Sequence, residues 1–397
     1  MRWLRQTIAV MLLNLRTLPG RLGSSSVAII GIAGVVVIFV SVLSISEGFY
    51  AAMTVAGSPD RALILRGGSD TEMTSGLPGL QTRVVKEGPG IRRDGTIPAA
   101  SAEVFVVIDL PKKSTPDSPA NVPMRGIEPN SMQTRTEVSI VEGRMFRFGT
   151  NEVIAGKAAS GQFLNLNVGD TIVSGANRWS VVGLFEADGG VAETEIWCDA
   201  HILQGIYGNG GGFNSVLAML DTPESFNKLH DWITTNPQTD GLTVMRESEY
   251  YRTRSEMMTR LINTLGFGVA SLMGIGAVFG AVLTMYTAVA SRTREIATLR
   301  ALGFNTTSVV VSVLTEAIML GAIGGAIGGG AAYFAFNGFQ TSTMNFQTFS
   351  QVAFAFRVTP RLLLTGLIYA LSIGLIGGLL PAIRAARLPI TSALREL

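Results

Sequence analysis

The sequence contains little that performs covalent chemistry. Its 397 residues include one cysteine, Cys198, and two histidines, His201 and His230. A single cysteine excludes an internal disulfide, and its strand-like surroundings are typical of a small, half-buried core residue rather than a reactive thiol. The patterns H-E-x-x-H and G-x-S-x-G are both absent from the sequence. We therefore expect no metal site and no catalytic residue in this chain.

A nucleotide-binding loop is missing as well. The phosphate-binding pattern G-x-x-x-x-G-K-[ST] needs glycine backbone around the phosphates, a lysine, and a hydroxyl group that binds Mg²⁺. The nearest match, N-E-V-I-A-G-K-A-A, has Asn151 in place of the first glycine and Ala158 in place of the hydroxyl residue. We expect that the chain hydrolyses no nucleotide itself, holds no cofactor, and leaves any ATP and Mg²⁺ to a partner subunit.

Charged residues are scarce and unevenly distributed. They make up 15% of the chain, whereas a typical soluble domain has about 25%. Residues 47–260 carry 19 Lys and Arg and 26 Asp and Glu, a net charge of −7, while the rest of the chain carries +9 and has no lysine. Because the basic residues stand at the ends of apolar runs and form no clustered face, no nucleic-acid partner is expected.

Four long apolar runs account for the positive mean hydropathy of +0.37. A helix needs about 20 apolar residues to cross the hydrocarbon layer of a membrane. Runs of at least that length occupy residues 24–46, 261–291, 305–336 and 361–383. The sequence therefore predicts a membrane protein with a four-helix transmembrane α-bundle.

Arginine placement predicts the orientation of these spans, because short loops rich in Lys and Arg stay in the cytoplasm. The arginine-rich segments are the N-terminal flank, the loop 292–304 and the tail 384–397, so both termini are expected to be cytoplasmic. The acidic section 47–260 then lies outside, together with the external loop 337–360, which has one charged residue.

Residues 1–23 are expected to form a cytoplasmic amphipathic elbow helix at the membrane surface. Trp3, Leu4, Ile8 and further apolar residues recur there at helical spacing between arginines. The alternative is a cleaved signal peptide that ends near Ala56. An uncleaved anchor is favoured because the apolar run is longer than the ~7–15 residues of a signal sequence.

The composition of residues 47–260 predicts a large extracytoplasmic α+β domain, inserted between spans 1 and 2 and long enough to bury its own core. Alternating and β-branched runs predict strands, and Asp221 with Thr222 predicts a helix start. The expected strands are 61–66, 102–110, 178–186, 194–199 and 214–220, the expected helices are 223–235 and 248 into the second span, and the expected loops are 115–120 and 208–212.

Glu316 is the one acidic residue inside an apolar run, and ionisable residues within a span are functional candidates. It lies within a turn or two of the cytoplasmic boundary. An ion pair with Arg292, Arg294 or Arg300 is therefore favoured over a place in an ion relay, which needs a second intramembrane acid.

Glycines in the third span predict close helix packing. Gly321, Gly325 and Gly329 recur every four residues and so share one helix face.

The loop after the second span predicts a short amphipathic helix. Ile296, Leu299 and Leu302 follow at i, i+3 and i+6, charged residues flank them, and Gly303 is typical of the residue after a helix end. Such a helix suits a groove on an ATPase. The alternative is a basic turn that binds lipid headgroups.

Two cytoplasmic segments resemble a known family. The loop S-R-T-R-E-I-A-T-L-R-A-L-G-F at 291–304 and the terminus G-L-L-P-A-I-R-A-A-R-L-P-I-T-S-A-L-R at 378–395 are similar to permease subunits of MacB/FtsX-like ABC transporters. The external motifs E-G-R-M-F, N-E-V-I-A-G, L-N-V-G-D-T-I and W-S-V-V-G-L-F resemble that family's external core domain. The resemblance extends over essentially the whole chain.

The resemblance implies a four-span permease without a fused ATPase, in the bacterial cytoplasmic (inner) membrane. It would work as a dimer, with itself or a paralogous permease, on a separate ABC ATPase subunit, and a periplasmic adaptor is a further partner of such proteins. ATP-driven movement would pass through the helices to the external domain and drive export or outer-leaflet extraction of a substrate. The implied ATPase-coupling residues are Arg292, Arg294, Glu295, Ile296, Leu299, Arg300, Leu302 and Gly303.

The implied cytoplasmic tail residues are Pro381, Arg384 and Arg387. The two arginines could pair with the ATPase, with Glu316 or with lipid phosphate, and the sequence does not choose among these.

Two other functions stay open for the same architecture. A non-transporting scaffold or sensor would relay the state of the ATPase to an external partner, although the external domain of such relatives is typically smaller. A lipoprotein-releasing permease would hold lipid-anchored cargo between the first and second spans.

Overall fold

The computed structural model of the chain describes residues 22–207, 211–344 and 350–387. The chain divides into two compact units. The helical unit consists of Met1–Glu47, Thr259–Phe339 and Phe356–Leu397, and the sheet unit consists of Gly48–Met258 and Gln340–Ala355. The elbow helix expected over 1–23 and the tail beyond residue 387 lie almost entirely outside the described residues.

Within the described residues, four helices are long and apolar enough to cross a membrane. Two of them exceed the expected spans, since α2 has 34 residues and α7 has 44. At 1.5 Å per residue these are about 50 and 65 Å long, against about 30 Å of hydrocarbon. The membrane sets the apolar length, whereas mostly polar residues extend α7 beyond it at its start and packing of Phe49, Ala52 and Met53 accompanies the extension of α2. The four helices are α2 (Leu22–Val55), α7 (Glu247–Ala290), α9 (Thr306–Phe336) and α10 (Pro360–Ala386).

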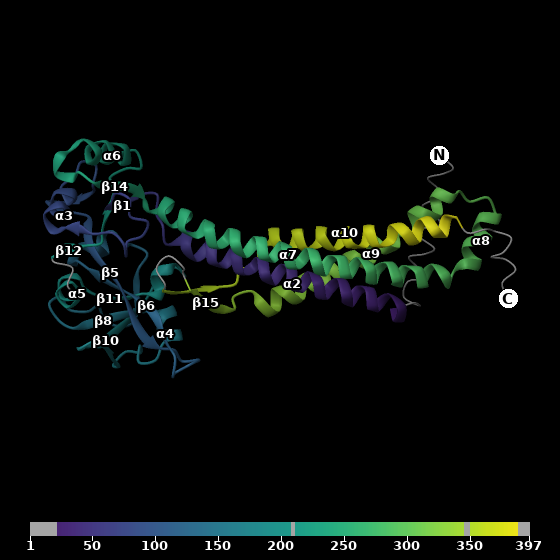
Figure 1. Ribbon diagram of the computed structural model, residues 1–397, viewed down its shortest axis with the longest axis horizontal. Coiled ribbons are helices and arrows are strands. Elements are labelled where there is room, and N and C mark those ends of the chain that lie inside the picture. The colour runs from purple at the N-terminus through teal and green to yellow at the C-terminus, as the bar shows by residue number, and fades with distance from the viewer. Residues whose placement is uncertain (1–21, 208–210, 345–349, 388–397) are drawn as a thin grey trace. The chain divides into compact units, whose positions relative to one another are not determined.

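Helix α9 packs closely against two neighbours through different glycine faces (Figure 1). A Cβ atom on Gly321 would lie 2.7 Å from the carbonyl oxygen of Ala370 in α10. A Cβ atom on Gly328 would lie 2.5 Å from the carbonyl oxygen of Ala33 in α2. Gly325 and Gly329 also face α10, where their Cβ atoms would meet Ala370 and Leu363. Any side chain at the tightest of these positions would push the helices apart.

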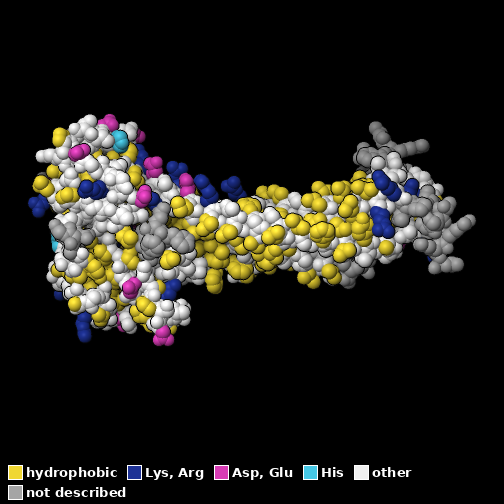
Figure 2. All heavy atoms as spheres, viewed as in Figure 1, with side chains coloured by type: hydrophobic (Ala, Val, Ile, Leu, Met, Phe, Trp, Pro, Cys, Tyr) yellow, Lys and Arg dark blue, Asp and Glu magenta, His cyan; other side chains and the backbone are white. Residues whose placement is uncertain are grey.

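The other faces of the helices leave large apolar side chains uncovered. On α7 they include Leu265, Leu272, Phe279 and Leu283. Figure 2 shows hydrophobic side chains along the helices on the face drawn, with Lys and Arg side chains at the end where Figure 1 labels the short helix α8 (Thr293–Ala301). An apolar surface of this extent is typical of helices that lie in lipid.

The sheet unit is built on one mixed sheet in the order β14-β1-β13-β5-β6-β11-β8-β10-β7, with β9 paired to β10. β6 with β11 and β8 with β10 are parallel, and the other pairs are antiparallel. The strands are β1 (Arg61–Arg66), β5 (Ala100–Pro111), β6 (Pro119–Ile127), β7 (Ser139–Gly143), β8 (Glu152–Gly156), β9 (Thr171–Ser174), β10 (Asn177–Glu186), β11 (Ile196–Asp199), β13 (Ser215–Met219) and β14 (Leu242–Arg246).

Smaller elements complete the sheet unit. Its remaining strands form two-stranded pairs, and its short helices cover the sheet. The paired strands are β2 (Leu77–Pro78) with β12 (Gly212–Phe213), β3 (Arg93–Asp94) with β4 (Ile97–Pro98), and β15 (Gln340–Met344) with β16 (Gln351–Ala355). The helices are α3 (Gly79–Lys86), α4 (Lys157–Gln162), α5 (Ala200–Tyr207), α6 (Ser225–Thr235) and the 3-10 turns η2 (Pro129–Gln133), η3 (Val191–Thr194) and η4 (Pro237–Thr239).

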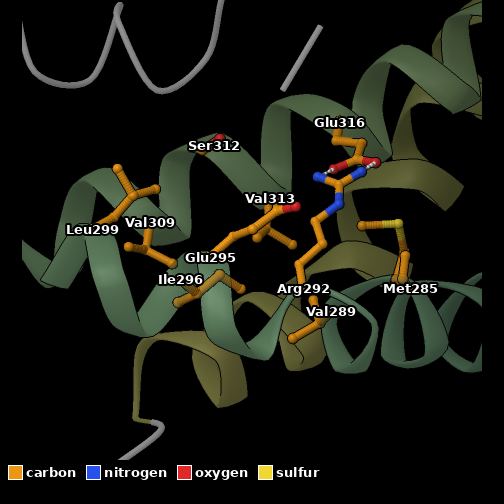
Figure 3. Close-up of a pocket in the computed structure, with 11 residues that line it drawn as sticks. Met285, Val289, Arg292, Glu295, Ile296, Leu299, Val309, Ser312, Val313 and Glu316 are labelled. Carbon is orange, nitrogen blue, oxygen red and sulfur yellow. Dashed lines mark hydrogen bonds and ion pairs between the residues drawn. The ribbon is translucent and has the colours of Figure 1, made fainter. Parts of the chain in front are cut away.

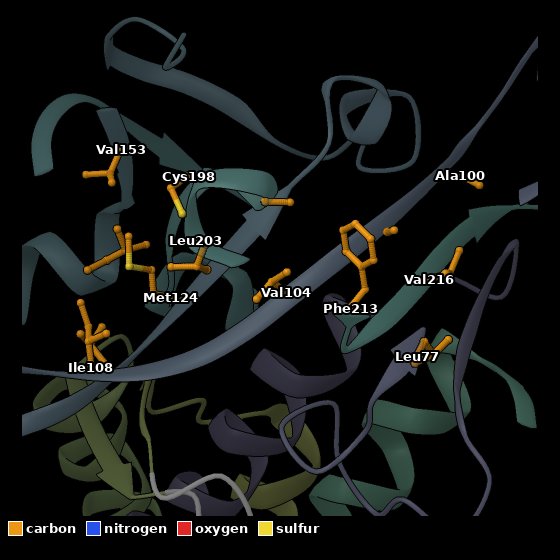
Figure 4. Packing of buried hydrophobic residues seen from close by; sticks show 14 of the residues in the cluster. Leu77, Ala100, Val104, Ile108, Met124, Val153, Cys198, Leu203, Phe213 and Val216 are labelled. Carbon is orange, nitrogen blue, oxygen red and sulfur yellow. The ribbon is translucent and has the colours of Figure 1, made fainter. Parts of the chain in front are cut away.

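Strand β5 connects the two halves of the large sheet. Its first residues, Ala100–Glu103, pair with β13, and Val104–Pro111 pair with β6. The apolar core runs along this strand (Figure 4). Cys198 lies fully buried in that core rather than half-buried, and burial raises the pKa of its thiol well above the ordinary value. The thiol therefore has no reactive character.

Several boundaries differ from expectation. The helix expected from residue 223 begins at Ser225, and its N-cap residue Glu224 makes no side-chain cap bond, so Asp221 and Thr222 lie before the cap. The loop expected over 115–120 overlaps β6, which starts at Pro119. The external loop 337–360 contains the hairpin β15–β16, which belongs to the sheet unit.

Candidate functional site

Helix α8 (Thr293–Ala301) connects α7 to α9 and has a defined end. The N–H of Phe304 donates to the carbonyl of Leu299 at 3.1 Å, and the N–H of Gly303 donates to the carbonyl of Arg300 at 3.1 Å. Gly303 has φ +91°, the left-handed backbone that glycine adopts without strain. These bonds form a Schellman motif, which ends the helix where the sequence predicts.

One side of α8 packs on the helices beside it. Ile296 and Ala297 are buried, and Ile296 joins a cluster with Val309 and Val313 of α9. Leu302 does not share this face, because its side chain is 73% exposed. At 100° per residue, a spacing of six residues places Leu302 about 120° from Ile296 around the helix. The expectation of a single apolar face through Leu302 is therefore wrong.

Arg292, the N-cap residue of α8, forms the ion pair with Glu316 in α9 (Figure 3). Nη1 donates to Oε2 at 2.8 Å and Nη2 donates to Oε1 at 2.7 Å, so the pair is bidentate. Both side chains are buried, with 6% and 5% of their surfaces exposed. Of the three arginines considered from the sequence, Arg292 is thus the one that pairs with Glu316, and the pair fixes the start of α8 to α9.

The ion pair borders a pocket whose lining comes from α7, α8 and α9 (Figure 3). Met285 and Val289 of α7 and Val313 of α9 contribute apolar side chains. On α8 and at its C-cap, the exposed residues are Arg294, Glu295, Thr298, Ala301 and Leu302, of which Glu295 also lines the pocket, while Leu299 and Arg300 are half-buried.

The end of α10 lies close to this region. Pro381 is buried inside the helix. The guanidinium of Arg384 lies over the ring of Tyr286 in α7, 5.2 Å from its centroid, a cation–π contact. Arg387 is exposed and follows the last residue of α10. Both carboxylate oxygens of Glu316 are bonded to Arg292, so the structure does not place either tail arginine on Glu316.

A second charged site lies inside the sheet unit, and sequence reasoning missed it. Arg125 of β6 is 1% exposed and donates hydrogen bonds to three carboxylates. These are Glu72 at 2.8 and 3.1 Å, Glu103 at 2.6 Å, and Glu195 at 2.7 and 2.8 Å. Arg135 shares Glu103 with it, at 2.7 Å. The signal in the sequence was a charge in the middle of the apolar strand V-P-M-R-G-I.

This cluster favours the ionised state of Glu72 and the charged state of Arg125. Burial favours the neutral form of Glu72, but the charge of Arg125 and hydrogen bonds from Arg125 and Ser215 outweigh it, so the pKa of Glu72 is lowered. Burial also opposes the charged form of Arg125, and its three glutamates raise its pKa well above the ordinary value. Glu72 and Arg125 therefore form a charged pair in the core of the sheet unit at neutral pH.

The two histidines stand apart from both sites. His201 begins the first turn of α5 and His230 lies in α6, and both side chains are exposed. Among the described residues, no three His, Cys, Asp or Glu side chains are grouped so that they could hold a metal ion.

Comparison with protein families matches almost the whole length of the chain. Residues 25–236 match the model of the MacB-like periplasmic core domain, and residues 267–390 match the model of the FtsX-like permease C-terminal region. The chain belongs to the MacB/FtsX-like family of ABC transporter permeases. Permeases of this family are membrane subunits that are not themselves enzymes, and the family implies a partner ATPase.

Individual relatives are more distant. The uncharacterized ABC transporter permease YvrN of Bacillus subtilis (strain 168) is 33% identical over 128 residues, which is 32% of this chain and 29% of that protein. The extracellular domain of the noncanonic ABC-type transporter YknZ from Gram-positive bacteria is 14% identical, with TM-score 0.36, over 47% of this chain and 100% of that domain. The periplasmic region of MacB from Actinobacillus actinomycetemcomitans is 12% identical, with TM-score 0.38, over 51% of this chain and 95% of that chain.

Proposed function

We propose that this permease couples ATP hydrolysis by a separate ATPase subunit to the export, or the extraction from the outer leaflet, of a substrate. The force would pass through the helices to the sheet unit. The observation that carries the proposal is α8, a short helix that the buried Arg292–Glu316 pair fixes to α9 while its outer side stays exposed.

The ATPase would bind the outer side of α8. Leu302 provides an exposed apolar contact, and Arg294 and Glu295 provide charges of both signs. A helix that presents an apolar anchor beside charges suits a groove on a partner. Ile296, buried on the inner side, would instead transmit the movement to α9. Arg292 is thus a positioning residue, because its guanidinium is bonded to Glu316 and does not reach a partner.

The membrane setting is part of the same proposal. Both termini and α8 would lie in the cytoplasm of a bacterial cell and the sheet unit outside the cytoplasmic membrane, as the arginine distribution predicts. The permease would work as a dimer with itself or a paralogous permease, and the sheet unit would contact cargo or a periplasmic adaptor.

The test compares two leucines of nearly equal exposure. Leu302→Asp changes the outer side of α8, where the leucine is 73% exposed, and Leu80→Asp changes α3 of the sheet unit, where it is 75% exposed. Each tagged full-length variant is extracted in mild detergent, and its stoichiometric partners are identified by mass spectrometry. The wild-type chain is expected to retain a protein with an intact G-x-x-x-x-G-K-[ST] loop.

Leu302→Asp is expected to lose this ATPase at least about tenfold, the typical cost of a central interface side chain, while Leu80→Asp retains it. Equal recovery of the ATPase with both variants would contradict the coupling role of α8. If the wild-type chain retains no ATPase in several mild detergents, the proposed transport function itself fails, and a scaffold or sensor role takes its place.

A further inference from the structure

The end of α2 and the beginning of α7 are in contact within the sheet unit. Helix α2 ends at Val55, and α7 begins at Glu247. The N–H of Ser248 donates to the carbonyl of Ser58 at 3.4 Å. A Cβ atom on Gly57 would lie 2.7 Å from the Cα of Ser248, so the two backbones are in direct contact. All these residues belong to the sheet unit.

Arg61, the first residue of β1, binds both helix ends at once. Its Nη2 donates to the carbonyl of Ala56 at 2.7 Å, directly after α2. Its Nε donates to Oε2 of Glu247, the first residue of α7. The same Glu247 oxygen accepts the N–H of Ser58 at 3.0 Å. One guanidinium therefore connects the end of α2 to the beginning of α7.

The third side of the guanidinium is fixed to the sheet unit. Nη1 of Arg61 donates to the carbonyl of Thr134 at 3.0 Å and to both oxygens of Glu137 at 2.7 and 2.8 Å. The side chain of Arg61 is 3% exposed and that of Glu247 is 2% exposed. Water therefore cannot easily replace these bonds. Lysine could not make them together, because its ammonium lacks the planar fork of five donors.

We propose that Arg61 is a positioning residue that locks α2 to α7, so that the two helices enter the sheet unit as one rigid piece. This inference rests on the proposed function, in which helix movement drives the sheet unit. Two helices that shifted independently would dissipate that movement, whereas a locked pair transmits it as one displacement.

The test measures how well the two helices hold their separation. Spin labels are placed at Tyr50→Cys in α2 and Met257→Cys in α7, both exposed positions within the sheet unit. The one native cysteine, Cys198, is buried with a raised thiol pKa and does not react. Pulsed electron–electron double resonance on the full-length chain then gives the distribution of the distance between the labels.

The key variant removes the lock without leaving a buried charge. In Arg61→Met/Glu137→Gln/Glu247→Gln the guanidinium and both of its carboxylate partners are replaced by uncharged groups, and the amide carbonyl introduced at position 247 can still accept the N–H of Ser58, so the unfolding temperature is expected to stay near that of the wild type. The distance distribution should become roughly twofold broader, as expected when a local contact opens. Arg61→Lys, which keeps the charge but not the fork, should also broaden it.

Two controls separate a lost lock from a general loss of order. The double variant Arg93→Met/Glu87→Gln removes an ion pair that is 39% and 61% exposed, and it should leave the distribution narrow. Adding Ser58→Cys/Ser248→Cys to the lock variant, with this pair oxidised to a disulfide before the labelling cysteines are reacted, should restore a narrow distribution.

Measuring the label distance with and without nucleotide tests whether the Arg61 contacts matter for the proposed function. In the complex with the ATPase, the wild-type distance should be the same without nucleotide and after vanadate trapping, whereas the lock variant should shift. A lock variant with a distribution as narrow as the wild type, at unchanged unfolding temperature, would overturn the inference. Absence of any ATPase partner would instead overturn the proposed function, and the comparison without nucleotide would still decide the role of Arg61.

Discussion

The two units of the molecule bury arginine in different ways. In the helical unit, Arg292 has a single carboxylate partner, Glu316, held in bidentate geometry between apolar helices. In the sheet unit, Arg125 has three, and one of them also binds Arg135. Within the described residues, Arg292 of the helical unit therefore belongs to a single pair with Glu316, whereas Arg125 of the sheet unit belongs to a network.

The difference follows from the surroundings of each site. Tightly packed helices with glycine contacts have room for one pair, and lipid offers no water to satisfy a second charge. A sheet with polar loops at its ends supplies many donors and acceptors. Removing the shared arginine of the network leaves three carboxylates without their partner. Removing one member of the Arg292–Glu316 pair leaves a single charged group without its partner.

The largest effect is expected for Arg125→Met. It leaves Glu72, Glu103 and Glu195 buried without their shared cation, so the loss should exceed the ~3–5 kcal/mol of a single broken buried pair. The sheet unit should not fold, and little monodisperse protein should survive size-exclusion chromatography. Arg93→Met is the control, because both members of its ion pair with Glu87 are exposed and its loss should change nothing measurable. Normal recovery of Arg125→Met would show that the network contributes little.

Glu316→Ala tests the isolated pair. It leaves Arg292 buried without a counter-charge, which should cost about 3–5 kcal/mol. The loss would be measured by helix unfolding in detergent with increasing SDS. The double variant Arg292→Met/Glu316→Leu should recover most of that stability, because no unpaired charge remains. If the double variant is no more stable than Glu316→Ala, the cost comes from packing rather than charge.

A smaller effect is expected where α9 packs on α10. Gly321→Ala places a methyl group 2.7 Å from the Ala370 carbonyl oxygen and should destabilise the helical unit by about 1–3 kcal/mol. Gly330→Ala is the matched control in the same helix, since its Cβ would meet no atom within 4 Å. Alanine there should instead stabilise the helix by up to about 1 kcal/mol. Unfolding of both variants in SDS measures these two changes in stability, which should have opposite signs. Equal changes would contradict the close packing of α9 on α10 at Gly321.

The smallest effect is the acid response of the network. The folded pKa of Glu72 lies below the ordinary 4.5. Its ionisation therefore stabilises the sheet unit fully above about pH 4.5, and this contribution is lost as the pH falls towards the folded pKa. The free energy of unfolding can be followed by tryptophan fluorescence. Between pH 5 and 4 it should fall less in Glu72→Gln than in the wild type. The same pH dependence in the wild type and in Glu72→Gln would contradict a lowered pKa of Glu72.

The features that were predicted from the sequence depend on the membrane or on local backbone conformation. The four apolar helices, the end of α8 at Gly303 and the pairing of Glu316 with a nearby arginine were all expected. Hydrocarbon thickness, glycine conformation and the cost of an unpaired intramembrane charge act within short stretches of chain, so they are visible in the sequence.

What the sequence did not predict depends on partners far apart in the chain. Arg125 meets Glu72 and Glu195, which lie 53 and 70 residues away, and Arg61 meets Glu247 at a separation of 186 residues. No local sequence pattern predicts contacts between residues so far apart in the chain. The outward position of Leu302 was missed for a different reason, because a spacing of i+6 was counted as the same helix face.

The central claim is that the outer side of α8 binds an ATPase, and contact in the native membrane tests it most directly. A photo-crosslinking amino acid is placed at position 302, with position 80 as the control, and cells are irradiated before extraction. Position 302 is expected to crosslink to a separate protein carrying the G-x-x-x-x-G-K-[ST] loop, and position 80 is not. Crosslinks from position 302 to lipid alone, while an ATPase co-purifies with the same chain, would contradict it.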